Sequence, residues 1–347
     1  MQTIWATEII INLVVQHLGA WLILPMKFFT LAGTPEFFLL IMPALYWCID
    51  PGIGRRLGIL LLLTAAINFD FKLIFHGPRP FWISTQVRAL DVETSFGIPS
   101  GHAQISAALW GFLARELRER WALWAAVIVI FLIGFSRIYL GMHFLSDVLA
   151  GWLIGAVILV AYAHWERPVR TWLSRRSLAE QFGLSFLTSL VVVGLGFLAR
   201  AILGVYTIPP DWLRNAASEG PALIPDPLSV KNLSLLGGVW LGFTFGVAWL
   251  GNQGGFDVRG SLHVRTLRFV LGVCGVAVLY WGGGALLPDK TSAPGEILQF
   301  LSSAIIGLWI SALAPMIFIR TRLARRPTPV SAVQPPVDHN VNDENRR

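Results

Sequence analysis

Charged residues are scarce in this chain of 347 residues. They make up 14% of it, whereas a soluble globular chain carries about 25%. Hydrophobic residues account for 55%, and the mean hydropathy is +0.63. This balance excludes a soluble globular enzyme and an intrinsically disordered chain, because apolar surface of this extent has to face lipid. The composition therefore predicts an integral membrane protein.

Cysteine is nearly absent as well, with only Cys48 and Cys274, and both lie in apolar runs. Two such residues build neither a disulfide framework nor a cysteine-rich metal site. The 33 glycines follow no three-residue period, which excludes a collagen-like chain. What the sequence does contain is a series of long apolar runs.

These runs predict about ten helical segments, since a helix that spans a bilayer needs about 20 mostly apolar residues. They lie near residues 5–30, 33–49, 56–75, 99–116, 121–139, 143–165, 178–204, 233–252, 265–287 and 295–320. Asp50-Pro51-Gly52 ends the second segment, and Pro99 opens the fourth. The first segment either spans the bilayer or lies in its interface, because it holds Glu8, Gln16, His17 and Lys27.

The net charge of +7, from 27 Lys and Arg against 20 Asp and Glu, needs no nucleic-acid partner. With the segments threaded up and down, most of these cations fall on one face. That face carries the connections 50–56, 116–120, 166–177 and 253–268 and the C-terminus. Positive residues mark the cytoplasmic side. We therefore expect a cytoplasmic C-terminus in a plasma (inner) membrane, although an endoplasmic-reticulum membrane would follow the same rule.

Three clusters of polar residues lie on the opposite face, where simple threading brings them together. They are Lys72 to Arg79-Pro80 after the third segment, Pro99-Ser100-Gly101-His102 at the start of the fourth, and Ser136-Arg137 to His143 and Asp147 between the fifth and sixth. Ionisable groups at membrane depth are costly, so they are candidates for a functional site.

The cations and the helix start of these clusters suit a tetrahedral oxyanion. Arg79 and Arg137 present forks of N–H donors that match phosphate oxygens in pairs, and Lys72 adds a point charge. Ser100 and Gly101 open a helix whose free N–H groups and dipole attract an anion. Gly101 also lets the backbone approach closely. The pattern predicts a phosphate-binding site.

Two histidines and one carboxylate add the chemistry. His143 and Asp147 are four residues apart on a helix, so the carboxylate can hold one ring nitrogen and leave the other as a nucleophilic lone pair. His102 is placed to protonate a leaving oxygen and later to take a proton from water. Together they predict phosphoryl transfer through a phosphohistidine. The fixed cations stabilise the charge, so neither a metal nor a cofactor is required.

The clusters Lys72-x6-Arg79-Pro80, Pro99-Ser100-Gly101-His102 and Ser136-Arg137-x5-His143-x3-Asp147 resemble the three signatures of the type 2 phosphatidic acid phosphatase (PAP2) superfamily. All three are complete and in order, and the resemblance covers about residues 1–165. It implies that Lys72, Arg79, Ser100, Gly101 and Arg137 bind phosphate. It also implies that His143 is the nucleophile, His102 the general acid and base, and Asp147 the group that orients His143.

The expected fold class is an all-α integral membrane protein. The resemblance implies a PAP2-like six-helix core, placed at residues 1–166. The apolar runs predict about four additional transmembrane helices at 177–322, which exceed that core, and the polar, proline-containing end predicts a disordered tail at 323–347. The long loop 205–232 lies on the face of the clusters, and we expect it to border the substrate entrance. The stripe Gly238-x3-Gly242-x3-Gly246 predicts close helix packing, within the chain or in a homo-oligomer.

The leading hypothesis is a lipid phosphate or pyrophosphate phosphatase among membrane lipids, with its site on the non-cytoplasmic face. A second is a phosphatase for a soluble phosphomonoester, similar to the glucose-6-phosphatase branch, which departs from this pattern at the position of Asp147. A vanadium haloperoxidase is similar at the motifs, but those proteins are soluble. A lipid-phosphate binding or transport protein is the fourth hypothesis, and residues 177–320 show no repeat of 1–165 to support it.

Overall fold

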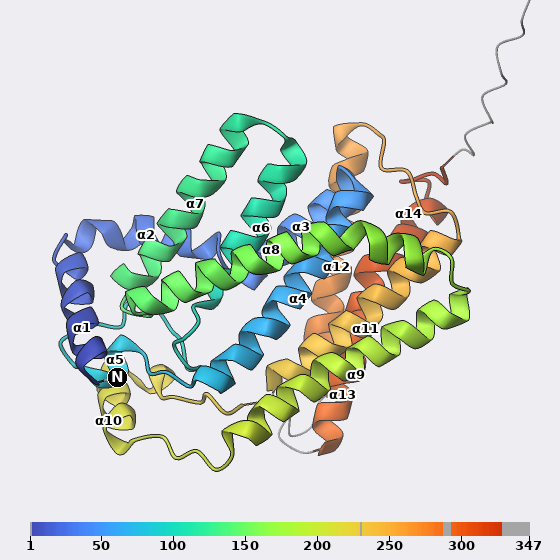
Figure 1. Cartoon of the computed structure of the whole chain (residues 1–347). Helices are drawn as coiled ribbons and strands as arrows, with labels where there is room; N and C mark the ends of the chain where they lie inside the picture. The colour runs from blue at the N-terminus through green and yellow to red at the C-terminus, as the bar shows by residue number, and fades with distance from the viewer. Residues whose placement is uncertain (1, 230, 287–292, 328–347) are drawn as a thin grey trace, which may run out of the picture.

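The computed structural model describes residues 2–229, 231–286 and 293–327, which form a bundle of helices (Figure 1). In chain order these are α1 (Gln2–Gln16), α2 (Ile23–Leu31), α3 (Pro35–Cys48), α4 (Pro51–Phe75), α5 (Pro80–Ile83), α6 (Gly101–Leu117), α7 (Arg120–Tyr139), α8 (Leu145–Leu173), α9 (Leu178–Leu203), α10 (Pro210–Glu219), α11 (Lys231–Asn252), α12 (Leu262–Leu286), α13 (Ala293–Leu308) and α14 (Ala314–Arg320). Extended pairing in this part of the chain is limited to one isolated bridge, Asp257 with Arg325. The predicted all-α class is confirmed.

Seven of the described helices are long and apolar enough to cross a membrane, or up to eight if a bent pair at the N-terminus is one span. The seven are Pro51–Ile83, Arg120–Tyr139, Leu145–Leu173, Leu178–Leu203, Asn232–Asn252, Leu262–Gly282 and Pro294–Arg320. Helices α3 and α6 are shorter, with 14 and 17 residues. The chain is therefore an integral, multi-pass membrane protein.

Local signals set the bounds of the helices that lead to the polar clusters. The Asp50 carboxylate accepts hydrogen bonds from the backbone of Gly52 and Ile53 at 2.7 and 3.0 Å, so α4 begins at Pro51, five residues before the predicted start. Helix α8 runs through an internal proline to Leu173, well past the predicted end at 165. The predicted tail beyond residue 327 lies outside the described residues.

The segment predicted as one helix at 5–30 is broken, which corrects that prediction. Helices α1 and α2 meet at 87° around Gly19, whose φ of 110° suits glycine and ends the first helix. Such a pair is either a broken span or a re-entrant loop. Figure 1 shows α1, α5 and α10 gathered at the end of the bundle where α8 begins.

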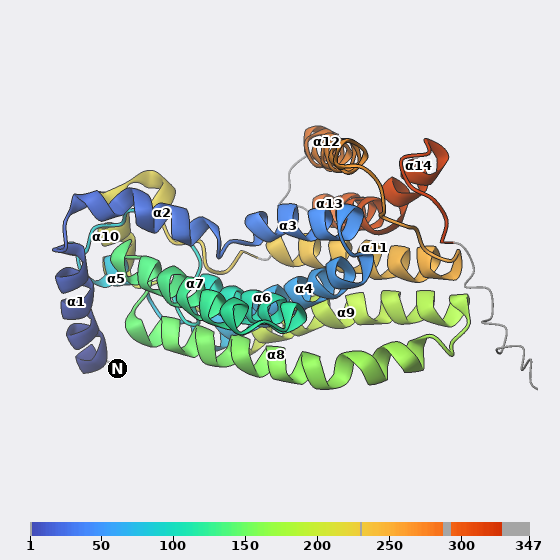
Figure 2. The same ribbon diagram turned by 90° about the horizontal axis from the view of Figure 1, so that it is seen from above.

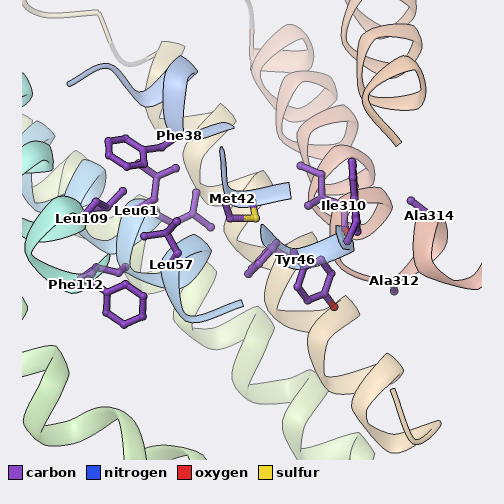
Figure 3. Close-up of a cluster of buried hydrophobic side chains, with 14 of the residues drawn as sticks. Phe38, Met42, Tyr46, Leu57, Leu61, Leu109, Phe112, Ile310, Ala312 and Ala314 are labelled. Carbon is purple, nitrogen blue, oxygen red and sulfur yellow. The ribbon is translucent and has the colours of Figure 1, made fainter. Parts of the chain in front are cut away.

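One hydrophobic cluster joins the N-terminal and C-terminal helices. It contains Phe38, Met42 and Tyr46 of α3, Leu57 and Leu61 of α4, Leu109 and Phe112 of α6, and Ile310, Ala312 and Ala314 of the C-terminal segment (Figure 3). The Tyr46 hydroxyl and the Trp47 indole donate to the carbonyls of Ser311 and Ile310 at 2.7 and 2.9 Å. The helices after residue 177 therefore share a core with α3 and α4.

The glycine stripe of α11 packs against α13 of the same chain. A Cβ atom at Gly242 would collide with the Ala304 carbonyl, and one at Gly238 with the Phe300 carbonyl, so α11 and α13 pack backbone to backbone. Figure 2 shows the helices in layers, with α12 outermost on one side and α8 on the other. The stripe thus gives no support to a seam between two copies, and the homo-oligomer stays a prediction.

The segment 205–232 contains a helix that the sequence did not predict. Pro210 opens α10 at its first turn, where proline is favoured, and Ala216 is buried. Asn215 donates to the Trp82 carbonyl at 3.0 Å, and the rings of Trp82 and Trp212 lie 5.7 Å apart. These contacts dock α10 on α5, at the end of the bundle that holds the polar clusters.

Candidate functional site

The three polar clusters meet in one buried network. Arg79 follows the C-terminal end of α4. The start of α6 carries Ser100, Gly101 and His102, and the connection from α7 to α8 carries His143. The Ser100 amide donates to the Asp147 carbonyl at 2.9 Å, which ties the second cluster to the third. Helices α6 and α8 can approach this closely because residue 151 is a glycine. A Cβ atom there would lie only 2.6 Å from the Ser100 carbonyl.

His143 is 1% exposed and has a different partner at each ring nitrogen. Its Nδ1 lies 3.3 Å from Oδ2 of Asp147, and its Nε2 lies 3.2 Å from a terminal nitrogen of Arg79. A carboxylate accepts and a guanidinium donates, so these partners assign the proton to Nδ1 and the lone pair to Nε2. Burial, reinforced by the charge of Arg79, holds the pKa of His143 well below its usual range.

The backbone at the start of α8 holds the Asp147 side chain in place. Its Oδ2 accepts a hydrogen bond from the Phe144 amide at 3.0 Å, in the first turn of α8. A carboxylate at this position also interacts favourably with the helix dipole. The predicted contact between His143 and Asp147 is present, but His143 lies just before α8 and not on it, which corrects the prediction that both residues share a helix face. The carboxylate that holds the ring is itself held by the backbone.

Arg79 is completely buried and contacts both the connection between α5 and α6 and the turn that carries His143. Its guanidinium donates to the carbonyls of Ser95 and Met142 at 2.6 and 2.8 Å, and it pairs with Glu93 at 3.3 Å. Lys72 lies on the same side, where its ammonium donates to Oγ of Ser95 at 3.1 Å and to the Phe96 carbonyl at 2.5 Å. Two of the three predicted phosphate-binding cations, Lys72 and Arg79, thus face the connection between α5 and α6.

Arg137 is also completely buried, and two carboxylates neutralise it. One of its terminal nitrogens lies 2.8 Å from Asp91, and the other lies 3.1 Å from Glu93. The first also donates to the Thr30 hydroxyl at 2.7 Å. A buried arginine needs such carboxylate partners, because an unpaired charge in the protein interior is costly.

Glu93 is a site residue that the motifs did not contain. One carboxylate oxygen pairs with Arg79, and the other pairs with Arg137 and lies 3.8 Å from Nδ1 of His102. Burial opposes its charge, but Arg79 and Arg137 outweigh burial and hold the pKa of Glu93 at about 2. Only the folded connection, residues 84–100, shows that Glu93 bridges two arginines that lie 58 positions apart in the sequence.

Helix α6 begins at the second polar cluster, and its role in binding an anion stays a prediction. Ser100 is its N-cap, and its hydroxyl accepts from the Ala103 amide at 3.4 Å. A Cβ at Gly101 would lie 3.0 Å from the side-chain oxygen of Asn68, so a larger residue there would crowd α4. His102 follows in the first turn, with its side chain 13% exposed.

The segment 205–232 supports the connection that carries Glu93. The Asp226 amide donates to the Thr94 carbonyl at 3.0 Å, and the ring of Tyr206 packs edge-on against Phe96 at 5.4 Å. Thr94 and Phe96 flank Ser95, which contacts both Lys72 and Arg79. These contacts support the expectation that the segment borders the entrance, and that expectation stays a prediction.

Among the described residues, no group of three or more His, Cys, Asp or Glu side chains is arranged to hold a metal ion. The site is instead a cluster of three cations, three carboxylates and two imidazoles at one end of a helical membrane bundle. Buried cations next to a histidine that a carboxylate orients form an environment that suits an anion.

Comparison with known proteins gives the family. Residues 54–170 match the PAP2 superfamily, and residues 235–326 match the transmembrane extension of PAP2 superfamily phosphatases. The two ranges together cover more than half of the chain. This chain belongs to the PAP2 superfamily. The second match also covers helices to which the sequence motifs assigned no role.

Several phosphatases are similar to parts of the chain. Mouse sphingosine-1-phosphate phosphatase 2 is 31% identical over 146 residues, which are 40% of this chain and 41% of the relative. Human glucose-6-phosphatase 3 is 33% identical over 187 residues, which are 46% of this chain and 53% of the relative. The chain thus spans about half the length of these curated relatives, and no solved structure gives a significant match.

Proposed function

We propose that the chain is a membrane phosphatase that hydrolyses lipid phosphates or pyrophosphates through a phosphohistidine at His143. One observation carries the proposal. A neutral imidazole is held at Nδ1 by Asp147, while Nε2 faces the buried guanidinium of Arg79. A nucleophile, its orienting carboxylate and a phosphate-binding cation are thereby in direct contact.

In the first step, the Nε2 lone pair of His143 attacks phosphorus, and the bond from phosphorus to the leaving oxygen breaks. The Nδ1 proton stays on the ring, where Asp147 stabilises the positive charge that develops. His102 delivers a proton to the leaving oxygen, so that the lipid departs as a neutral alcohol or a protonated phosphate.

In the second step, water attacks phosphorus while His102 takes one of its protons. The bond between phosphorus and Nε2 breaks, and its electron pair returns to His143. The products are inorganic phosphate and the free enzyme, so atoms and charges balance. Lys72, Arg79 and Arg137 neutralise the phosphoryl oxygens throughout, with Ser100 and Gly101 at the helix start, and the steps require no metal ion.

A lipid substrate is supported by the membrane bundle and by the similarity to sphingosine-1-phosphate phosphatases. The similarity to glucose-6-phosphatase 3 favours a soluble phosphomonoester as the second candidate. The charge distribution of the sequence supports a plasma membrane location, with the site on the non-cytoplasmic face and the C-terminus in the cytoplasm. Within this proposal, residues 1–166 are the catalytic core and 177–322 an accessory bundle.

The experiment is phosphate release by the purified full chain in detergent micelles with EDTA. Substrates are an isoprenyl pyrophosphate, phosphatidate, sphingosine 1-phosphate and glucose 6-phosphate. The proposal expects release from at least one lipid at a rate that EDTA does not change. Release from glucose 6-phosphate alone would select the soluble substrate, and no release from any of them would overturn the proposal in favour of binding or transport.

Replacing Glu93 by glutamine is expected to tighten inhibition by inorganic phosphate about tenfold. The carboxylate occupies N–H donors of Arg79 and Arg137 and repels an incoming phosphate, whereas a neutral amide does so far less. The same change is expected to lower the melting temperature, because two buried arginines lose a counter-charge.

The matched control for this prediction is Glu180→Gln, which removes an equal charge from the exposed start of α9. The inhibition constant of phosphate is measured for both variants and for the unmodified chain. A constant that stays the same or rises in Glu93→Gln would contradict the assignment of Glu93 as a competitor of phosphate.

A further inference from the structure

Helix α1 carries one polar stripe on an otherwise apolar surface. Glu8, Asn12 and Gln16 are spaced four residues apart and therefore lie on one face. Glu8 is 8% exposed and Asn12 is fully buried. On the opposite face, Ile10 and Val14 are 59% and 62% exposed, as expected for side chains that meet lipid. The stripe thus faces protein, and its partners identify its role.

All three polar side chains reach the junction of α7 and α8. We name residues 138–146 the nucleophile turn; they comprise the end of α7, the connection 140–144 and the start of α8. Asn12 donates from Nδ2 to two carbonyls, that of Ile138 at 2.9 Å and that of His143 at 3.1 Å. These carbonyls lie at either end of the bend, so one side chain bridges it. The bond to the His143 carbonyl is made on the backbone of the proposed nucleophile itself.

The other two residues of the stripe fix the turn on either side of Asn12. The Glu8 carboxylate accepts from the Ser146 amide at 2.7 Å and from its hydroxyl at 2.8 Å. The Gln16 amide donates to the Tyr139 carbonyl at 3.0 Å and to the Arg88 carbonyl at 2.9 Å. The turn is therefore attached to α1 at its start, its middle and its end.

The turn needs this support because its central residues, 140–144, belong to neither helix. It bends through Gly141, whose φ of 74° is left-handed, and its amides at 142 and 143 both return to the Arg137 carbonyl. The contact from His143 to Asp147 is already 3.3 Å long, so a small displacement of the turn would lose it. A misplacement of about 1 Å can cost a reaction about 100-fold in rate.

We infer that Glu8, Asn12 and Gln16 are positioning residues. They hold the nucleophile turn so that His143 stays aligned with Asp147. The inference rests on the proposed function of His143. It assigns to α1 a role in catalysis without contact to substrate. Removing the contacts of the polar stripe lowers the rate of phosphoryl transfer, while the proposed phosphate-binding cations keep their geometry.

The test is Asn12→Ala in the full chain, assayed on the lipid phosphate that the unmodified chain hydrolyses best. We expect kcat to fall about 10- to 100-fold, with KM and the inhibition constant of inorganic phosphate within about twofold. A merely structural role would reduce the yield of folded protein and leave kcat per folded molecule unchanged. Rates are therefore normalised to the monodisperse fraction.

Two variants serve as matched controls. Val14→Ala alters the lipid-facing side of the same helix, and Ser189→Ala removes a buried hydrogen bond to the Gly237 carbonyl, 2.8 Å long and far along the chain from the turn. Both are expected to keep kcat within about twofold. If both lower kcat as much as Asn12→Ala does, the effect is general destabilisation and the inference is overturned.

If Asn12→Ala does not yield folded protein, Glu8→Gln decides the question. Glutamine keeps the shape and one acceptor oxygen but loses one of the two bonds to Ser146, and we expect about a fivefold fall in kcat with unchanged KM. A kcat within twofold of the unmodified chain, for whichever of the two variants folds, overturns the inference alone. An unmodified chain without phosphatase activity overturns the proposed function and the inference with it.

Discussion

Replacing His143 by alanine is expected to reduce turnover of a lipid phosphate by about 10,000-fold or more. In the proposed mechanism the change removes the atom that forms the bond to phosphorus, and no other described side chain combines a carboxylate at one ring nitrogen with a guanidinium at the other. Inorganic phosphate should still inhibit the residual activity with a similar constant, because Lys72, Arg79 and Arg137 remain. The measurement is steady-state phosphate release by monodisperse protein.

His17→Ala is the matched control for that experiment. His17 lies at the end of α1, is exposed, and bonds only to the Leu13 carbonyl among the described contacts. It should retain full turnover. A His143→Ala protein that keeps a tenth of the activity or more would contradict the nucleophilic role and leave His143 as a binding residue.

Replacing Arg79 by lysine is expected to lower kcat/KM about 1,000-fold, although the charge is kept. The guanidinium donates at once to Ser95, Met142 and Glu93, and its fork also faces Nε2 of His143. A single ammonium cannot supply donors in all these directions, so both the phosphate site and the connection 84–100 lose support. The melting temperature should fall as well, since Arg79 is completely buried.

Arg88→Lys makes the same chemical change at an exposed position of that connection, where only the backbone is engaged. It should leave kcat/KM within about twofold. An Arg79→Lys enzyme with more than a tenth of the normal kcat/KM would show that charge alone suffices there. The fork geometry would then have no part in phosphate binding.

The positions of the three motifs could be predicted from the sequence because helix length and threading fix them. Apolar runs of spanning length carry each cluster to a helix end, and alternate ends fall on one face. The spacing of four residues correctly predicts the contact between His143 and Asp147, but the assumed helix is wrong for His143, which lies before the N-cap of α8. The structure brings all eight predicted site residues into one network, and their chemical roles stay predictions.

The residues that the sequence did not reveal lie in irregular segments or act at a distance. Glu93 stands close to the second motif in the chain, but nothing in its surroundings shows that it bridges Arg79 and Arg137. Helix α10 is short and polar, so it lacks the long apolar run that predicts a membrane-spanning helix. In both cases tertiary contacts decide the structure, and local pattern carries little of that information.

The N-terminal segment carries a sequence signal for the position of α1. Glu8 and Gln16 made it doubtful as a plain span, since polar groups are costly in lipid. Their spacing with Asn12, at intervals of four residues, indicates a single polar face and therefore a protein partner. The break at Gly19 then separates this face from α2, so that α1 can turn toward the end of the bundle.

The most direct test of the central claim is to trap and map the phosphoenzyme. His102→Ala is mixed with an aryl phosphate whose leaving group needs no proton, then quenched in alkali, where a bond from phosphorus to histidine survives. The first step should proceed while the attack of water slows, so phosphate accumulates on the protein. The account predicts one phosphorylated peptide with the group on His143. A phosphate found on any other residue would contradict it.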